Sequence, residues 1–80
     1  MDITPLLHKV MDRRALTRTE SHEAFSAIMR GDVTPVQLAA FLAALRVKGE
    51  SVEEITGAAE AVTASFFAFE YLNKTEVVFE

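Results

Sequence analysis

Few residues in this sequence could take part in catalysis, and they do not form a site. Histidine is the side chain best suited to acid–base work near neutral pH, and the chain has only His8 and His22. The two lie in different predicted helices without the spacing of metal ligands. His22 is followed directly by Glu23, and neighbouring side chains on a helix point in different directions. We therefore predict no catalytic residue.

Metal and cofactor binding are excluded on similar grounds. The chain has no cysteine, so disulfides and thiolate metal sites cannot form. Its three glycines, Gly31, Gly49 and Gly57, are far apart and do not make a phosphate-binding loop. Gly57 falls inside a predicted helix, where its expected role is to let a neighbouring helix approach closely. The sequence predicts no metal-binding and no cofactor-binding residue.

Ser51 offers one alternative with covalent chemistry. Acyl carrier proteins are acidic four-helix proteins of about this size, and they carry a prosthetic group on a serine at a helix start. Ser51 has that position and an acidic neighbour in "GESVEE", but it lies late in the chain and already serves as a helix cap. A mass shift after incubation with a phosphopantetheinyl transferase would identify this class.

Charge and hydropathy exclude two kinds of partner. The net charge is −4 and no basic stripe is present, so the chain is not expected to bind nucleic acid. The tight turn in "IMRGDVTPVQL" is typical of a helix-turn-helix, but the helix after it lacks early polar side chains that could read bases. No apolar run is long enough to span a membrane, and the N-terminus lacks a secretory signal pattern. We expect a cytoplasmic protein.

The elements that would position any site are predicted by helix-capping signals. Thr17, Thr34 and Ser51 are each followed three residues later by Glu or Gln, and this pair forms a capping box. Thr4 is the expected cap of the first helix, and Pro5 follows it at the first helical position, where a missing N–H has no cost. Four helix starts are therefore predicted.

Helix ends are also marked, and together the signals define an all-α fold. Gly31 and Gly49 suit the left-handed conformation that often ends a helix. The connections are short, as in a compact bundle. We predict a single helical domain over residues 1–80, with a short C-terminal tail. Its four helices are expected at about residues 4–13, 18–30, 35–48 and 52–72.

The end of the fourth helix depends on one pattern. Apolar residues follow a 3,4,3,4,3 spacing from Val52 to Phe69, and no Gly or Pro interrupts it before Asn73. We call this line of residues the seam: Val52, Ile55, Ala59, Val62, Phe66 and Phe69. The alternative is that "SFFAFEYL" and "EVVFE" form strands, because aromatic residues and valines favour sheets.

The third helix has almost no polar face. Between Val36 and Leu45 only Gln37 is polar, and a helix that is apolar on all sides is enclosed or covered by a partner. We therefore predict a homodimer interface on the first and third helices, together with the aromatic end of the fourth. An alternative is that small residues on the third helix merely let its neighbours pack closely. The predicted interface residues are Ile3, Leu7, Val36, Ala40, Phe41, Ala44, Phe66, Phe67 and Phe69.

One long stretch resembles a known family. "IMRGDVTPVQLAAFLAALRVKGESVEEITGAAEAV", residues 28–62, closely resembles the N-terminal helical domain of the anthranilate phosphoribosyltransferases. The shared pattern is a Met-x-Gly-acid-Val-Thr-Pro run, then Gln-x-Ala-Ala-Phe-Leu-x-Ala-Leu-Arg, then Lys-Gly-Glu-Ser-x-Glu-Glu-Ile. The resemblance extends over about residues 3–64. Pyrimidine nucleoside phosphorylases share a looser version and remain an alternative.

The resemblance implies a function for a larger enzyme. Such an enzyme transfers phosphoribose from phosphoribosyl pyrophosphate to anthranilate, with magnesium, in tryptophan biosynthesis. Its phosphate-binding loop and metal-binding acids belong to a following α/β domain, so no cofactor is expected in this chain. The small domain is implied to pack at a homodimer interface or to dock onto the large α/β domain. We expect no enzyme activity from this chain alone.

The resemblance stops before the chain does. Residues 65–80, "SFFAFEYLNKTEVVFE", do not look like a lead into a phosphate-binding domain. We therefore expect an atypical tail, as in a truncated or rearranged domain, which could supply a covering surface of its own.

Overall fold

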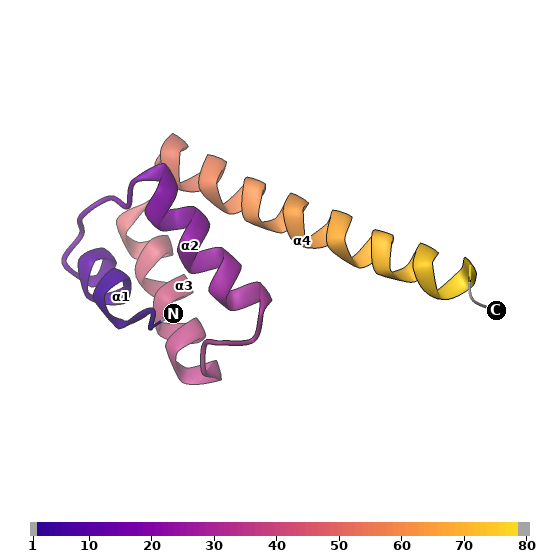
Figure 1. Cartoon of the computed structure of the whole chain (residues 1–80). Coiled ribbons are helices and arrows are strands. Elements are labelled where there is room, and N and C mark those ends of the chain that lie inside the picture. Colours follow the sequence, from indigo (N-terminus) through magenta and orange to yellow (C-terminus); the bar gives the residue numbers. More distant parts are fainter. Residues whose placement is uncertain (1, 79–80) are drawn as a thin grey trace.

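The computed structural model describes residues 2–78, with side chains described as far as Ser65. Over this range the fold is all-α, as predicted, and the four helices are joined by short turns (Figure 1). The alternative of strands in the tail is wrong for residues 65–78, which are helical, and residues 79–80 lie outside the described range. The helices are α1 (Thr4–Met11), α2 (Arg18–Met29), α3 (Pro35–Lys48) and α4 (Val52–Val78).

Three of the four predicted caps are confirmed. Thr17 and Thr34 each complete a capping box, and the Ser51 hydroxyl accepts a bond of 3.2 Å from the Glu54 N–H. The prediction that Thr4 caps α1 is wrong. Thr4 is itself helical, and its N–H and hydroxyl donate to the Asp2 carboxylate at 3.0 and 2.7 Å. Asp2 therefore accepts the hydrogen bond from an N–H group at the start of α1 that has no partner within the helix.

The ends of α2 and α3 lie where the glycines predict them, whereas α1, which has no glycine at its end, ends earlier than predicted. Gly31 and Gly49 have φ of 77° and 88°, in the region that favours glycine. α1 ends at Met11 and not near residue 13, because Arg13 adopts a φ of 62°. The Arg13 and Arg14 N–H groups then donate to carbonyls of the preceding turn, at 2.9 and 3.0 Å. This is a Schellman end built on an arginine.

The hydrophobic core lies between α1, α2 and α3. Phe41 is fully buried, and its ring meets Phe25 edge-on, with centroids 5.8 Å apart and planes at 64°. Such aromatic pairs favour edge-to-face contact and add to the energy of burial. α1 closes this core with buried Ile3 and Val10, and Leu16 closes it from the connection to α2.

α4 packs against α2 by close approach of the two backbones. A Cβ placed on Gly57 would lie 2.3 Å from the Arg18 carbonyl oxygen, so a larger residue does not fit without movement. The Ser21 hydroxyl donates to the Glu54 carbonyl at 2.6 Å across the same contact. Ala61 is buried one turn further along α4. The expected role of Gly57 as a packing position is confirmed.

α4 is longer than the sequence indicated. It continues to Val78, past the expected end at residue 72. At 1.5 Å per residue a helix of 27 residues is about 40 Å long. Figure 1 shows that its second half, coloured orange to yellow, extends well past the end of α2. The longest dimension of the molecule is accordingly 51 Å, against 25 and 18 Å for the other two.

Candidate functional site

Glu54 is a buried carboxylate that links the start of α4 to the α1–α2 connection, the end of α3 and the α3–α4 connection. Its two oxygens accept from the Leu16 N–H at 2.9 Å, the Ser51 N–H at 2.8 Å and the Lys48 ammonium at 2.6 Å. Burial opposes ionisation and raises the pKa of Glu54, but the bonds from Leu16, Lys48 and Ser51 together lower it below its ordinary value. These donors occupy the carboxylate, so Glu54 has a structural role and is not a general base.

Two more ion pairs connect helices at the surface. The Arg18 guanidinium donates twice to Glu60, at 2.6 and 2.9 Å, and links α2 to α4. The Lys9 ammonium donates to Glu20 at 2.7 Å, and this bond lowers the pKa of Glu20, with a further contribution from the Thr17 N–H. Exposed pairs of this kind each contribute little to stability.

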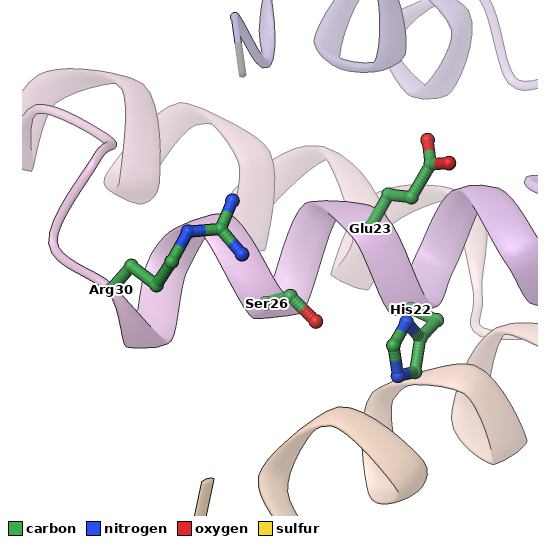
Figure 2. Close-up of a pocket in the computed structure, with 4 residues that line it drawn as sticks. All are labelled: His22, Glu23, Ser26 and Arg30. Carbon is green, nitrogen blue, oxygen red and sulfur yellow. The ribbon is translucent and has the colours of Figure 1, made fainter. Parts of the chain in front are cut away.

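A hollow beside α2 is lined by four polar or charged side chains, but these do not have the arrangement of an active site. Its described lining comes from α2 and from Arg30 directly after it, and its volume is about 410 Å³ (Figure 2). His22 points toward α4, whereas Glu23 points to the opposite side of the helix. The Arg30 guanidinium is paired with Asp32 at 3.1 Å. The groups therefore do not converge on one point. The four lining residues are His22, Glu23, Ser26 and Arg30.

No metal centre is present in the part of the chain that the structure describes. Within it, no three side chains of the His, Cys, Asp and Glu types lie close enough to share an ion. The same residues contain no helix with the length and hydropathy needed to cross a bilayer. Large apolar side chains are exposed on α1, α2, α3 and α4, and two apolar surfaces stand out.

The first apolar surface, the α1–α3 face, lies where the end of α1 meets the outer side of α3. Val36 and Val47 are 79% and 75% exposed, and Met11 is 59% exposed. A hollow of about 300 Å³ opens between Met11, Ala43 and Val47. Contiguous exposed apolar side chains of this kind mark contact surfaces more often than chance. The face consists of Met11, Val36, Ala40, Ala43, Ala44 and Val47.

The predicted interface residues divide into three groups. Val36 is exposed on the α1–α3 face, and Leu7, Ala40 and Ala44 are half-buried beside it. Phe66, Phe67 and Phe69 lie outside the described side chains. Two of the predicted residues, Ile3 and Phe41, are 1% and 0% exposed in the core of a single chain, so no partner can touch them in this fold.

Sequence reasoning also omitted residues that the structure places on this surface. Ala43 lies three residues after Ala40, and Val47 lies four residues after Ala43. The helical period therefore places both on the same face as Val36 and could have predicted them. Met11 could not have been found in this way, because its exposure depends on where α1 ends.

The second apolar surface, the α4 groove, runs along the flank of α4 next to its contact with the bundle, where Phe25 of α2 also lines it. Ile55 and Val62 are 57% and 46% exposed, and Val52 beside them is 77% exposed. The groove has a volume of about 450 Å³ and continues onto Phe25 of α2 and Leu45 of α3. The first part of the seam is therefore an outward face. The groove is lined by Phe25, Leu45, Glu50, Glu54, Ile55, Ala58, Ala59, Val62 and Thr63.

Comparison with known proteins identifies the fold. The family described as "Glycosyl transferase family, helical bundle domain" matches residues 4–66, which include α1, α2, α3 and the first half of α4. The chain belongs to this family. The family match ends at Phe66, close to where the predicted atypical tail begins.

Individual relatives agree with the family. The anthranilate phosphoribosyltransferase of Gluconobacter oxydans (strain 621H) is 57% identical over 61 residues, which are 76% of this chain and 17% of that protein. The corresponding protein of Methylobacterium radiotolerans is 58% identical over 60 residues, 75% of this chain and 17% of the relative. That of Rhizobium rhizogenes (strain K84) is 48% identical over 69 residues, 86% of this chain and 20% of the relative. The domain thus spans about a fifth or less of these proteins, and the resemblance seen in the sequence is confirmed.

Proposed function

We propose that this chain acts as the N-terminal helical domain of an anthranilate phosphoribosyltransferase and brings two copies together through the α1–α3 face. The observations that support the proposal are the exposure of Val36, Val47 and Met11 and the hollow in which Met11 meets Ala43 and Val47. Burying apolar surface stabilises a complex by about 25 cal/mol per Å². Two-fold dimers use the same patch on both copies, and a flat apolar face on a helix pair suits such contact.

Catalysis is not assigned to the residues of this domain. Magnesium and phosphoribosyl pyrophosphate are the groups that the family resemblance implies, and the described residues do not fit them. Acidic side chains do not cluster there. Two glycines end helices and the third contacts α2, so they are not available to cradle a phosphate. The transfer reaction would therefore be carried out by residues outside this domain.

The test of the association proposal is the mass of the full chain in solution. Val47→Glu places a charge in the middle of the face and should weaken self-association by about tenfold or more, which sedimentation equilibrium measures. Met29→Glu is the matched control, because Met29 is an exposed apolar residue on α2, 49% accessible and away from the face. A wild-type mass equal to one chain at tens of micromolar would contradict the proposal.

The link to transfer is tested separately. The chain is mixed with a polypeptide that carries the α/β domain of a relative, and phosphoribosyl transfer to anthranilate is assayed. Activity that appears only in the mixture would support a role as a separate small subunit. Its absence would leave association as the only function of this chain. We do not carry the acyl-carrier alternative further, because the Ser51 hydroxyl caps α4.

A further inference from the structure

The seam positions of α4 continue past the part of the helix that packs on the bundle. Val52, Ile55 and Val62 are exposed along the first half of α4, and Ile55 and Val62 line the α4 groove. The helix continues unbroken to Val78, so positions 66, 69, 73 and 77 keep the same register. One line of the helix therefore runs from the α4 groove into the half that extends beyond α2 (Figure 1).

The two halves of α4 have the same length and opposite composition. Ser65 is the central residue of Val52–Val78, with 13 residues on each side. The first half is rich in small residues, among them Gly57, Ala59 and Ala64, whereas the second half carries most of the aromatic residues of the chain. Large side chains on one helix pack well against small ones on a facing helix. The aromatic residues of the second half are Phe66, Phe67, Phe69 and Tyr71.

The family match adds an independent reason to consider this half. It stops at Phe66, so residues 67–78 form a helical extension that the family pattern does not account for. The α4 groove, in contrast, lies within the matched part. The chain thus combines an apolar groove of about 450 Å³ with a further stretch of helix that is rich in aromatic residues.

We propose that the second half of α4 in one copy packs into the α4 groove of a second copy, with the two α4 helices antiparallel about a two-fold axis that passes between positions 65 and 66. In this arrangement Val62 lies opposite position 69, and Ile55 lies opposite positions 76 and 77. The second half of each α4 occupies the α4 groove of the other copy. Because both grooves are then filled, this contact joins two copies and no more.

Charge favours the antiparallel direction. Lys74 is the single basic residue after Lys48, in a segment that is otherwise acidic. The antiparallel register brings position 74 level with Gly57 of the second copy, one helical turn from the exposed Glu53. A parallel pair would instead set each lysine beside the other and leave both grooves uncovered. Opposite charges one turn apart across helices set the orientation of coiled pairs.

The pairing is tested first by cross-linking, for which a chain without cysteine is well suited. A chain with Val62→Cys is mixed with a second, longer-tagged chain with Phe69→Cys under oxidised glutathione. We expect a disulfide between the two different chains and none between two Val62→Cys chains, which are too far apart in the antiparallel register. Cross-linking of Val62→Cys to itself, or no cross-link in the mixture, would overturn the proposal.

A second measurement separates this contact from the α1–α3 face. Val62→Glu and Leu42→Glu alter two side chains with the same exposure, 46%, and only Val62 lines the α4 groove. We expect Val62→Glu to weaken self-association by about tenfold or more and Leu42→Glu to leave it unchanged, with helix content by circular dichroism equal in both. Equal association of the two variants would overturn the proposal.

The proposal does not depend on the function proposed above, and the variants distinguish the two. If both contacts exist, Val47→Glu removes the α1–α3 contact and Val62→Glu removes the α4 contact. Each variant then keeps one contact, so its mass in solution falls below that of the wild type but stays above the mass of one chain. If only the α4 pair exists, Val62→Glu alone yields a single-chain mass. If only the α1–α3 face is used, Val47→Glu yields a single-chain mass and Val62→Glu has the wild-type mass, which refutes the α4 pair.

Discussion

The two sides of α4 differ in a way that reverses the usual rule for helices. The side that contacts α2 contains a glycine, an alanine and a buried glutamate, namely Gly57, Ala61 and Glu54. The outward side contains Val52, Ile55 and Val62, all at least 46% exposed. In an ordinary amphipathic helix the apolar side chains would cover the core. Here the small and hydrogen-bonded residues do so.

The difference shows that close backbone approach, not hydrophobicity, positions α4 on α2. Gly57 allows the two helices to touch, and Ser21 and Glu54 satisfy the polar groups that the contact buries. The apolar side of the same helix is therefore left for another partner. Four variants test this division of roles, starting with the largest expected effect.

Glu54→Ala should destabilise the fold the most. It leaves the Leu16 N–H and the Lys48 ammonium without their carboxylate in a site that is 2% exposed. Removing one partner of a buried ion pair costs about 3–5 kcal/mol of unfolding free energy. Urea denaturation at one fixed protein concentration measures the loss. Glu53→Ala is the control, because its side chain is exposed one residue earlier on the same helix turn. Equal stabilities of the two variants would refute the structural role of Glu54.

Gly57→Ala should destabilise by up to about 2 kcal/mol. Replacing glycine with alanine inside a helix normally gains about 1 kcal/mol, but the new Cβ would lie 2.3 Å from the Arg18 carbonyl oxygen. The resulting overpacking costs about 1–3 kcal/mol, and the helices must move apart. Thermal denaturation measures the net change. A stabilised variant would mean that α2 and α4 are not in contact at this point.

Acid should weaken the fold through Glu54. Its pKa is lowered in the folded state, so the stability that it contributes is complete above its ordinary value of 4.5 and is lost as the pH falls through the folded pKa. The difference in urea midpoint between wild type and Glu54→Gln should therefore be constant near neutral pH and become smaller below pH 4.5. A difference that stays the same at all pH values would show that the charge of Glu54 is not responsible.

Ile55→Ser should have the smallest effect on folding. Ile55 is 57% exposed on the outward side, and surface substitutions of this kind change stability by less than about 0.5 kcal/mol. Denaturation at a low protein concentration, at which the chains are dissociated, measures the change in unfolding free energy without a contribution from association. A loss as large as that of Gly57→Ala would mean that the outward side also supports the fold of one chain.

Local signals predicted most of the fold because they are encoded in neighbouring residues. The capping boxes at Thr17, Thr34 and Ser51 depend on pairs three residues apart, and all three form. The end of α1 could not be read in this way, because Arg13 adopts a left-handed conformation that its residue type does not favour. The extension of α4 to Val78 had no marker either, since asparagine at position 73 does not have to end a helix.

The surfaces were harder to predict because exposure depends on which helices meet. The spacing of Val36 and Ala40 correctly indicates a shared face on α3. It could not indicate that Phe41 between them would meet Phe25 and lie in the core. The seam of α4 was visible in the sequence, but its outward direction follows from Gly57, whose effect appears only once α2 lies against it.

The position of Glu54 has a mechanical consequence for the rest of α4. The carboxylate fixes the first turn of the helix to the ends of two other segments, through Leu16 and Lys48. Gly57 and Ala61 hold the rest of the first half against α2, so the second half of α4, about 20 Å long, is the part whose direction can change. A tilt of about 5° where that half begins moves its far end by about 1.7 Å, roughly one residue of helix rise. Small changes in the α2–α4 contact therefore displace the C-terminal end of the helix.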